Sequence, residues 1–443
     1  MKTTGRTGRA GRWPATFVFA WLALVLGGPS LSSIAGESFQ AGAAKVEITP
    51  DTRITNWVGH RPYTGVLDPL FVHALAMDDS TNELLLLTYD LVDTREPFVA
   101  RVRRGVADAI GISESNILVH ASHTHSAPWA PVYDAPLLAH ERKMVQPVES
   151  DPLFQSWARE LILRSVEAAR TAHQARCPVT LAIGRASVPE MLFNRRPRRP
   201  DGMVETTYEP TDPSVLPNGL RFGPMDPTLT VLSFRAAGRT NIATLFHLPC
   251  HPVTIYPYHE GLSADWPGGV AERLERALGG VALFLQGCAG DIVPARRGFA
   301  AYEAMSDLIS KRALNAMDKS VALTHPAVRS RLARIELPLT AAARADTGLN
   351  RFTSEVQVLS IGDLVWVSLP GEPLTDLNTT LQQRSPFPHT LVLGYSGGGG
   401  VQYVGLPGEK ARGGYEMTEA GAGADECGGV LVEAAVRLLQ GLR

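Results

Sequence analysis

Short apolar runs that end in polar residues or glycine recur along most of the chain. Runs at Phe71–Met77, Leu84–Val92 and 116–121 predict strands, and the second is apolar without a break, as in a strand buried on both faces. Apolar residues at helical spacing predict a helix over 98–110, between the last two of these strands. The order strand, helix, strand is typical of an α/β sheet, which places polar residues at the carboxyl ends of its strands.

The same alternation continues to the end of the chain. We expect one large mixed α/β domain whose buried strands deliver site residues at their carboxyl ends, because no linker or internal repeat interrupts the pattern. The remaining strands are predicted at 44–50, 179–183, 229–234, 243–248, 281–285, 355–360, 364–368 and 391–395, and the remaining helices at 153–174, 269–278, 302–317 and 429–442.

The N-terminus differs from the rest in its pattern. Four basic residues precede the apolar run Ala15–Gly27, and the small-x-small pattern Ser33-Ile34-Ala35 follows. This order predicts a secretory signal peptide over 1–35 and a mature domain over 36–443 in a secreted or periplasmic protein. An uncleaved anchor is the alternative, since the run is only a little short of a membrane span.

The amino-acid composition limits the kinds of molecule that the protein is expected to bind. The 443 residues carry a formal net charge of −2, with 19% charged and 44% hydrophobic residues, so nucleic acid is not expected as the main partner. Four cysteines in an exported chain permit disulfides, and buried free thiols are an equally good interpretation. The cysteines are Cys177, Cys250, Cys288 and Cys427.

Two histidines follow the strand predicted at 116–121. Residues i and i+2 of a strand face the same side, so an extension of the strand would point His123 and His125 into one cavity. Neutral imidazole is a good zinc ligand, and the pattern therefore favours a metal site. The alternative is a pair of hydrogen-bonded loop histidines.

Other polar residues also follow predicted strands. His251 comes after the strand at 243–248, and Glu372 comes after the strand at 364–368. Either residue alone is compatible with a structural role, as a core histidine or a turn glutamate. The irregular segment 194–227 contains the run Arg195-Arg196-Pro197-Arg198-Arg199, of which we expect three arginines to be solvated.

The motifs taken together resemble the catalytic domain of neutral (non-lysosomal) ceramidases, zinc amidases that cut the amide bond of N-acylsphingosine. The resemblance runs from the opening strand at 44–50 to about Tyr415, with the motifs in the order of the family. The matching blocks are Ser122-His123-Thr124-His125-Ser126, Asn194-Arg195, His251-Pro252, Gly290-Asp291, Leu369-Pro370-Gly371-Glu372, Tyr403-Val404 and Tyr415-Glu416.

The resemblance implies a zinc site and a set of substrate-facing residues. Carried over position by position, the zinc ligands are His123, His251, Glu372 and Tyr403. The residues implied to face the substrate are His125, Arg195 and Tyr415. The resemblance thus separates the two neighbouring histidines into a ligand and an acid/base group.

Two features depart from the family. Val293 stands where the family has a serine proposed to be catalytic, so we expect a metal-activated water in place of a serine nucleophile. The chain ends soon after Tyr415, so we expect it to lack the immunoglobulin-like C-terminal domain of the family. Both departures leave the lipid substrate open.

The sequence therefore predicts an exported zinc-dependent amidohydrolase acting on the N-acyl amide of ceramide or a similar lipid. The alternatives are a hydrolase of the same scaffold acting on another amide or ester, and a non-catalytic lipid- or glycan-binding protein. The expected partner is a small-molecule or lipid substrate, and peripheral contact with a membrane is compatible with it. A metallo-β-lactamase type of site is disfavoured by Ala127-Pro128, and an amidohydrolase barrel by the lack of regular strand–helix repeats.

Overall fold

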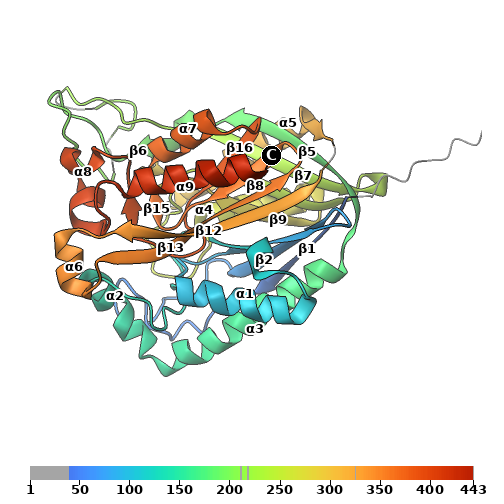
Figure 1. Cartoon of the computed structure of the whole chain (residues 1–443), viewed down its shortest axis with the longest axis horizontal. Coiled ribbons are helices and arrows are strands. Elements are labelled where there is room, and N and C mark those ends of the chain that lie inside the picture. Colours follow the sequence, from blue (N-terminus) through green and yellow to red (C-terminus); the bar gives the residue numbers. More distant parts are fainter. Residues whose placement is uncertain (1–38, 210–211, 217–218, 325, 443) are drawn as a thin grey trace, which may run out of the picture. The chain divides into compact units, whose positions relative to one another are not determined.

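The computed structural model describes residues 39–209, 212–216, 219–324 and 326–442 (Figure 1). The predicted signal peptide over 1–35 lies outside these residues. The described part of the chain belongs to a single compact unit.

A large mixed sheet takes up the first two thirds of the unit. Its strand order is β4-β3-β2-β1-β5-β7-β8-β9, with β11 beside β5, and β3–β4 and β8–β9 are its parallel pairs. The strands are β1 (Gln40–Glu47), β2 (Phe71–Asp78), β3 (Glu83–Tyr89), β4 (Ile117–Ala121), β5 (Cys177–Ser187), β7 (Thr228–Ala236), β8 (Asn241–Leu248), β9 (Val281–Gln286) and β11 (Val321–Leu323).

A second sheet of four strands follows, in the order β12-β13-β14-β16, in which β14 and β16 are parallel. Its strands are β12 (Val328–Pro338), β13 (Arg351–Ile361), β14 (Leu364–Ser368) and β16 (His389–Leu393). Two short pairs lie beside the sheets: β6 (Leu192–Asn194) with β10 (Ile292–Pro294), and β15 (Glu372–Pro373) with β17 (Tyr403–Val404).

The two sheets pack face to face, and helices cover their outer faces (Figure 1). One apolar cluster joins Leu84 and Leu86 of β3 to Leu364 and Trp366 of β14. The outer faces carry α1 (Glu96–Ile110) and α3 (Pro152–Gln174), then α4 (Asp265–Leu278) and α5 (Phe299–Asp318), and on the second sheet α7 (Thr375–Arg384) and α9 (Cys427–Leu442). Shorter helices are α2 (Ala139–Glu149), α6 (Ala341–Thr347) and α8 (Glu409–Arg412).

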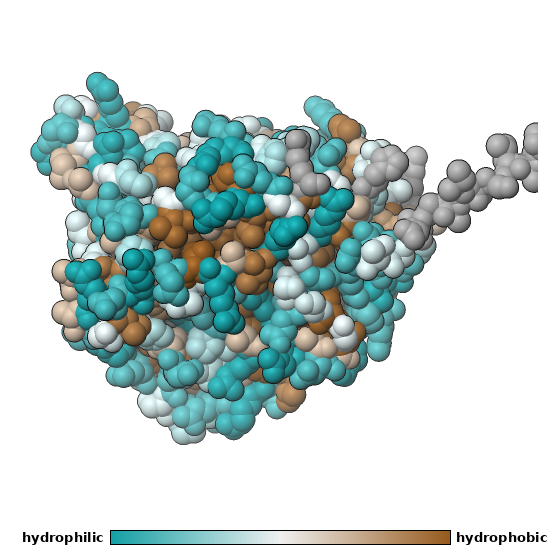
Figure 2. Space-filling view, in the orientation of Figure 1, coloured by the Kyte–Doolittle hydropathy of each residue, from teal (hydrophilic) through white to brown (hydrophobic). Residues whose placement is uncertain are grey.

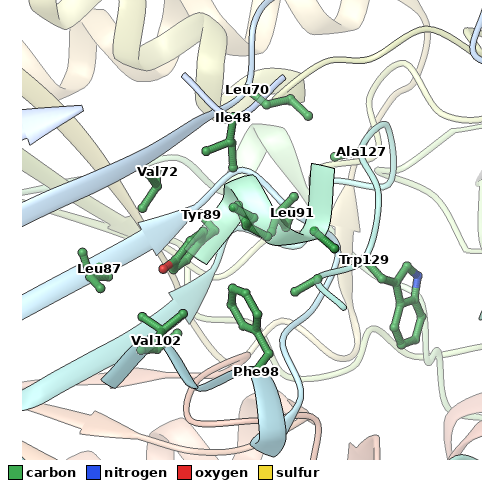
Figure 3. Packing of buried hydrophobic residues seen from close by; sticks show 14 of the residues in the cluster. Ile48, Leu70, Val72, Leu87, Tyr89, Leu91, Phe98, Val102, Ala127 and Trp129 are labelled. Atoms are coloured by element: carbon green, nitrogen blue, oxygen red, sulfur yellow. The ribbon is translucent and has the colours of Figure 1, made fainter. Parts of the chain in front are cut away.

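Strand β3 shows why this layering suits the sequence. Leu84 and Leu86 face the second sheet, whereas Leu87 and Tyr89 pack on the opposite side against Phe98 of α1 (Figure 3). A strand between two apolar layers needs an unbroken apolar run, and this is the pattern predicted for Leu84–Val92. The prediction of a mixed α/β fold with strands buried on both faces is confirmed.

Several elements were missed by the sequence pattern, among them α2, α7 and β12. Helix α2 contains Pro147, which predicts a helix break. Helix α7 is polar apart from two leucines, and β12 carries four arginines or glutamates among its alternating positions. Helix α7 and strand β12 pack against α9, and α2 packs against α3. No local pattern reveals these contacts.

The four cysteines are free in the structure, and three of them are buried. The interpretation as free thiols is therefore the one that the structure supports. The face shown in Figure 2 is mostly hydrophilic, with apolar side chains gathered near its middle. Among the described residues, no helix combines the length and the apolar character needed to cross a bilayer.

Candidate functional site

The two histidines at 123 and 125 lie in a loop and not on a strand. Strand β4 ends at Ala121, so the prediction that strand alternation brings their side chains together is wrong. The reason they meet is that His123 has a positive φ of 68°, which turns the chain. Its N–H donates to Leu91 O at 3.0 Å, and the two rings meet edge to face with centroids 4.7 Å apart.

His251 enters the same site from the parallel pair β8–β9. It follows β8, and its backbone N–H donates to Ile292 O at 3.0 Å, beyond the end of β9. Its Nδ1 lies 2.7 Å from Ala289 O and 3.0 Å from Ile292 O. The ring is fully buried and fixed by both carbonyls, so its Nε2 faces the site.

Glu372 comes from the second sheet through a tight turn. Gly371 has φ of 69°, and a Cβ there would collide with the carbonyl oxygen of Gln402. The next residue, Glu372, donates its N–H to the same Gln402 O at 3.0 Å. In the short parallel pair β15–β17, Glu372 stands directly opposite Tyr403. Two of the predicted ligands are therefore neighbours in one ladder.

These side chains converge on Glu372. Its Oε2 lies 3.2 Å from His123 Nε2 and 3.3 Å from His251 Nε2, while His125 Nε2 lies 3.1 Å from His123 Nε2. Ring nitrogens of the three histidines all lie within 4.8 Å of one another. The structure thus brings together every histidine and the glutamate that the sequence singled out.

The backbone contacts of the rings distinguish the three histidines. His123 Nδ1 lies 2.6 Å from Val92 O, so Nδ1–H donates there and Nε2 directs its lone pair into the cluster, as it does in His251. Metal-binding histidines are usually held in this way by a second partner. His125 Nδ1 is buried without any partner. Its ring is fixed by packing against Trp57, with centroids 5.6 Å apart.

Burial sets the charge of the site. It lowers the pKa of His251 to about 4 and that of His125 well below its usual range, and Arg195 and the neighbouring rings act in the same direction. Burial opposes ionisation of Glu372, but contacts with His123 and His251 outweigh it and hold the pKa of that carboxyl well below its usual range. His125 and His251 are therefore neutral at neutral pH.

Arg195 connects the cluster to the late part of the chain. It follows β6, and its Nη2 donates to Tyr403 Oη at 3.0 Å and to Gly290 O at 2.7 Å. Its Nε donates to Glu416 Oε1 at 2.7 Å. The Asn194-Arg195 and Gly290-Asp291 motifs also meet directly, because Asn194 Nδ2 donates to Asp291 Oδ2 at 2.8 Å.

The prediction that three arginines of the 195–199 run are solvated is wrong. Arg196 is buried like Arg195, and its guanidinium pairs with Glu416 at 2.8 Å and Glu409 at 3.1 Å. Arg198 is partly buried and also reaches Glu409, at 3.2 Å. Only Arg199 has half of its side chain exposed. The carboxylates that pair with the run lie about two hundred residues further along the chain, which explains the error.

A cavity of about 600 Å³ opens above the cluster. Tyr415 lines it, with its ring 5.9 Å from Tyr403 and 5.8 Å from Tyr208. Burial and the charge of Glu372 raise the pKa of Tyr415 to about 12, so its hydroxyl stays protonated. The cavity is lined by Trp57, Val58, His60, His125, Lys143, Met144, Arg195, Tyr208, Glu209, His251, Val253, Tyr256, Pro257, Arg297, Tyr403 and Tyr415.

Val293 does not line this cavity. It lies in β10 opposite Phe193 and is fully buried in an apolar cluster with Phe193, Val253 and Ala295. The side chain at this position therefore supports the wall of the cavity and offers no polar group to a substrate.

Tyr395 was missed by the sequence reasoning. It is fully buried, its ring lies 4.3 Å from that of His123, and its hydroxyl lies 3.4 Å from Glu372 Oε2. It stands at the end of the strand predicted at 391–395, where the rule that polar residues at strand ends form the site would have found it. Trp57, Tyr208 and Tyr256 were missed because they lie in irregular segments without a pattern.

The donor set fits a zinc ion. His251 Nε2 is buried without a hydrogen bond although Glu372 Oε2 is 3.3 Å away, so two acceptor atoms face each other with no proton donor between them. Such a contact is unfavourable unless a cation lies between them. Two or three histidines with one carboxylate are the ligands of catalytic zinc sites.

The fold is that of known ceramidases. A crystal structure of neutral ceramidase from Pseudomonas aeruginosa superposes with a TM-score of 0.73 over 91% of this chain and 74% of that chain, at 16% sequence identity. A structure described as ceramidase complexed with C2 gives a TM-score of 0.74 over 92% of this chain and 75% of that chain, also at 16% identity. No protein-family model and no curated protein matches the sequence. The chain therefore has the neutral ceramidase fold that its motifs predicted.

Proposed function

We propose that the protein is an exported zinc-dependent amidohydrolase that cleaves the N-acyl amide bond of ceramide or a similar lipid. The observation that carries the proposal is the convergence of His123, His251 and Glu372 beneath a cavity whose walls present His125 and Tyr415. The structural neighbours, which are described as ceramidases, support the same class of reaction.

The site residues would divide the work as follows. His123, His251, Glu372 and Tyr403 would hold the zinc ion, which when bound supplies Lewis-acid polarisation of the amide carbonyl and an activated water. His125 is neutral at neutral pH, so it can accept a proton and pass it to the leaving amine. Tyr415 keeps its proton and can donate a hydrogen bond to the carbonyl oxygen as negative charge develops.

The remaining contacts would position the substrate. Arg195 is held rigidly by Glu416 and Gly290 O, and it presents the edge of its guanidinium to the cavity next to Tyr403. The apolar side chains Val58, Met144 and Val253 line the same cavity and suit an acyl chain. Val58 is 43% exposed, which is compatible with contact at a lipid surface.

The decisive experiment measures zinc content and turnover in the same samples. The purified protein is incubated with labelled ceramide before chelation, after chelation and after zinc is restored. We expect activity to follow zinc, and His123→Ala, His251→Ala and Glu372→Ala each to lose the metal, whereas His125→Ala retains the metal and loses turnover. Full zinc content in all three ligand variants would refute the assignment.

A second candidate is hydrolysis of a different N-acyl amide on the same scaffold. It is favoured by the positively charged side chains Lys143 and Arg297 in the cavity, since ceramide carries no charge for them to bind.

A non-catalytic binding protein is disfavoured by the complete set of ligating residues. Ligand binding by a zinc-free preparation that shows no turnover on any amide would favour that reading.

Export is proposed on the basic, apolar and small-residue order of residues 1–35. The mass of the mature protein recovered from the producing cell tests it. A chain that begins just after Ala35 is expected, and a full-length chain retained in the membrane fraction would refute cleavage.

A further inference from the structure

We infer that the substrate carries a negatively charged oxygen group, a carboxylate or a phosphate, that binds to Arg297 on the cavity wall. The inference rests on the proposed function and names the substrate class within it. Four observations carry it: the contacts of Arg297, the contrast with other arginines, its place beside the acid/base groups, and the charge of the cavity lining.

Arg297 uses few of its donors. Its Nη1 lies 3.4 Å from Tyr256 O and its Nη2 lies 3.2 Å from Tyr208 O, both long contacts to neutral acceptors. Its Nε is buried without a partner. Guanidinium has five N–H donors in a fixed fork, and the unused ones suit a bidentate anion.

Three buried arginines elsewhere in the chain are paired with carboxylates. Arg95 lies 2.6 Å from Glu141, Arg103 lies 2.6 Å from Glu355, and Arg195 lies 2.7 Å from Glu416. Arg297 forms no ion pair with any carboxylate of the described residues. Burial lowers the pKa of Arg297, and the attraction of Glu209 and Asp265, which form no ion pair with it, does not offset this.

The two carbonyls that hold Arg297 belong to the aromatic walls of the cavity. The ring of Tyr256 lies 5.2 Å from that of His125, and the ring of Tyr208 lies 5.8 Å from that of Tyr415. Arg297 is therefore fixed between the segments that flank both acid/base groups. A substrate whose amide lies between His125 and Tyr415 can extend toward it within the same cavity.

The lining carries more positive than negative charge. Its cations are Lys143, Arg195 and Arg297, and its only carboxylate is Glu209, which accepts a hydrogen bond from Tyr258 Oη at 2.5 Å. Arg195 is neutralised by Glu416, and Lys143 is exposed. An anionic substrate would therefore be favoured over a neutral one, and N-acyl amino acids and phosphorylated ceramides are the two sources of such a group.

Paired substrates test the inference. The value of kcat/KM is measured for N-dodecanoylglycine and its methyl ester, and for ceramide 1-phosphate and ceramide. We expect the charged member of at least one pair to be preferred by about 10-fold to 100-fold, the range of a charge-assisted hydrogen-bonded pair. A preference in the glycine pair assigns a carboxylate, and one in the ceramide pair assigns a phosphate.

Variants connect the preference to Arg297. In Arg297→Gln the ratio between charged and neutral substrates is expected to fall to about one, and in Arg297→Lys, which keeps the charge without the fork, to an intermediate value. Arg296→Gln is the matched control, because Arg296 is the exposed neighbour outside this cavity and should keep the full ratio.

The failures are distinguishable. Equal kcat/KM values within both pairs, or a preference that survives Arg297→Gln, would overturn the inference and leave the proposed amidase function standing. Absence of turnover on all four substrates by the zinc-loaded protein would count against the proposed function itself. Should Arg297→Gln not fold, as judged by its melting temperature, the ratio in Arg297→Lys decides.

Discussion

Two regions of the protein place a buried histidine and a buried carboxyl group beside a cavity at the ends of strands. One is the candidate site, with His123, His251 and Glu372. The other contains His73 of β2 and Asp90, the residue directly after β3, and lines a cavity of about 270 Å³ against α4. By residue type and place in the fold the two regions look alike.

The two regions differ in the hydrogen bonds that hold their side chains. At the candidate site, backbone carbonyls hold His123 and His251 by Nδ1, and their Nε2 atoms converge on one carboxylate oxygen. In the second region His73 Nδ1 has no partner, and Asp90 accepts a hydrogen bond from the backbone N–H of Phe71 at 2.9 Å. Among the described residues, three close metal-ligating groups of this kind are found at the site alone.

The charges differ accordingly. Burial raises the pKa of Asp90 to about 8, and the attraction of Lys45 in the same cavity does not offset it, whereas contacts with His123 and His251 hold the pKa of Glu372 well below its usual range. Polar residues at strand ends are therefore insufficient to identify a site. The convergence of free lone pairs, fixed by contacts behind them, is what separates a metal centre from a buried acid.

The largest expected effect separates the two carboxyl groups. Glu372→Gln should weaken zinc binding by more than about 100-fold and abolish turnover, because loss of even an outer contact of a metal ligand costs about 10-fold to 100-fold. Asp90→Asn, the matched change in the second region, should keep both. Zinc content after dialysis and kcat are the measurements. Retention of zinc by Glu372→Gln would mean that Glu372 and Asp90 do not differ in metal binding.

The next effect concerns Tyr415, the proposed hydrogen-bond donor to the carbonyl oxygen. Tyr415→Phe should lower kcat by about 10²-fold to 10³-fold, the cost of one oxyanion donor, with zinc content unchanged. Since the pKa of Tyr415 is about 12, the wild-type rate should show no loss from its ionisation up to pH 10. Tyr133→Phe, outside the cavity, is the control. An unchanged kcat in Tyr415→Phe would contradict the assigned role.

A smaller effect tests how the turn places Glu372. Gly371→Ala should cost about 1–3 kcal/mol of unfolding free energy and weaken zinc binding, because its φ is positive and a Cβ meets Gln402 O. Gly348 has a similar φ of 73°, but a Cβ there would meet no neighbouring atom. Gly348→Ala should therefore lose stability through backbone strain alone and keep its zinc affinity. Denaturant titration measures the unfolding free energy of each variant, and competition with a chelator measures its zinc affinity. Equal zinc affinities would show that the turn does not position the ligand.

The smallest effect is the pH dependence due to Asp90. Its pKa is about 8 in the folded protein and about 3.9 in an unfolded chain, so the folded state binds the proton more tightly and stability falls as pH rises from about 4 to about 8. Asp90→Asn cannot ionise and still accepts from the Phe71 N–H. Its melting temperature relative to wild type should therefore rise by a few degrees between pH 5 and pH 8. A constant difference would mean that Asp90 is not buried as described.

Much of the fold and of the site could be predicted from local sequence. The unbroken apolar run at β3 predicted a strand between two layers, and polar residues after apolar runs predicted His251 and Glu372. The approach of Glu372 to Tyr403 was implied by the family resemblance alone, because their pairing is a contact between short strands with no local pattern of their own.

The wrong predictions share one cause, which is that contacts between distant parts of the chain override local patterns. Arg196 was expected at the surface because a run of charge is usually solvated, but Glu409 and Glu416 pair with it from far along the chain. His123 and His125 meet through a positive φ at a residue that is not glycine, which no periodicity encodes. Local patterns thus predict which residues reach a strand end, and tertiary contacts decide how they face one another.

Three of the four proposed ligands, His123, His251 and Glu372, follow three separate strand pairs, β3–β4, β8–β9 and β14–β16, which are far apart along the chain. No fragment that contains only one of these pairs can form the site. A cation at the site would bind the folded chain and not its parts, so its binding free energy adds to the free energy of unfolding. Contacts between residues so far apart in sequence form slowly. The rate of zinc uptake during refolding would therefore report the rate at which the last tertiary contacts form.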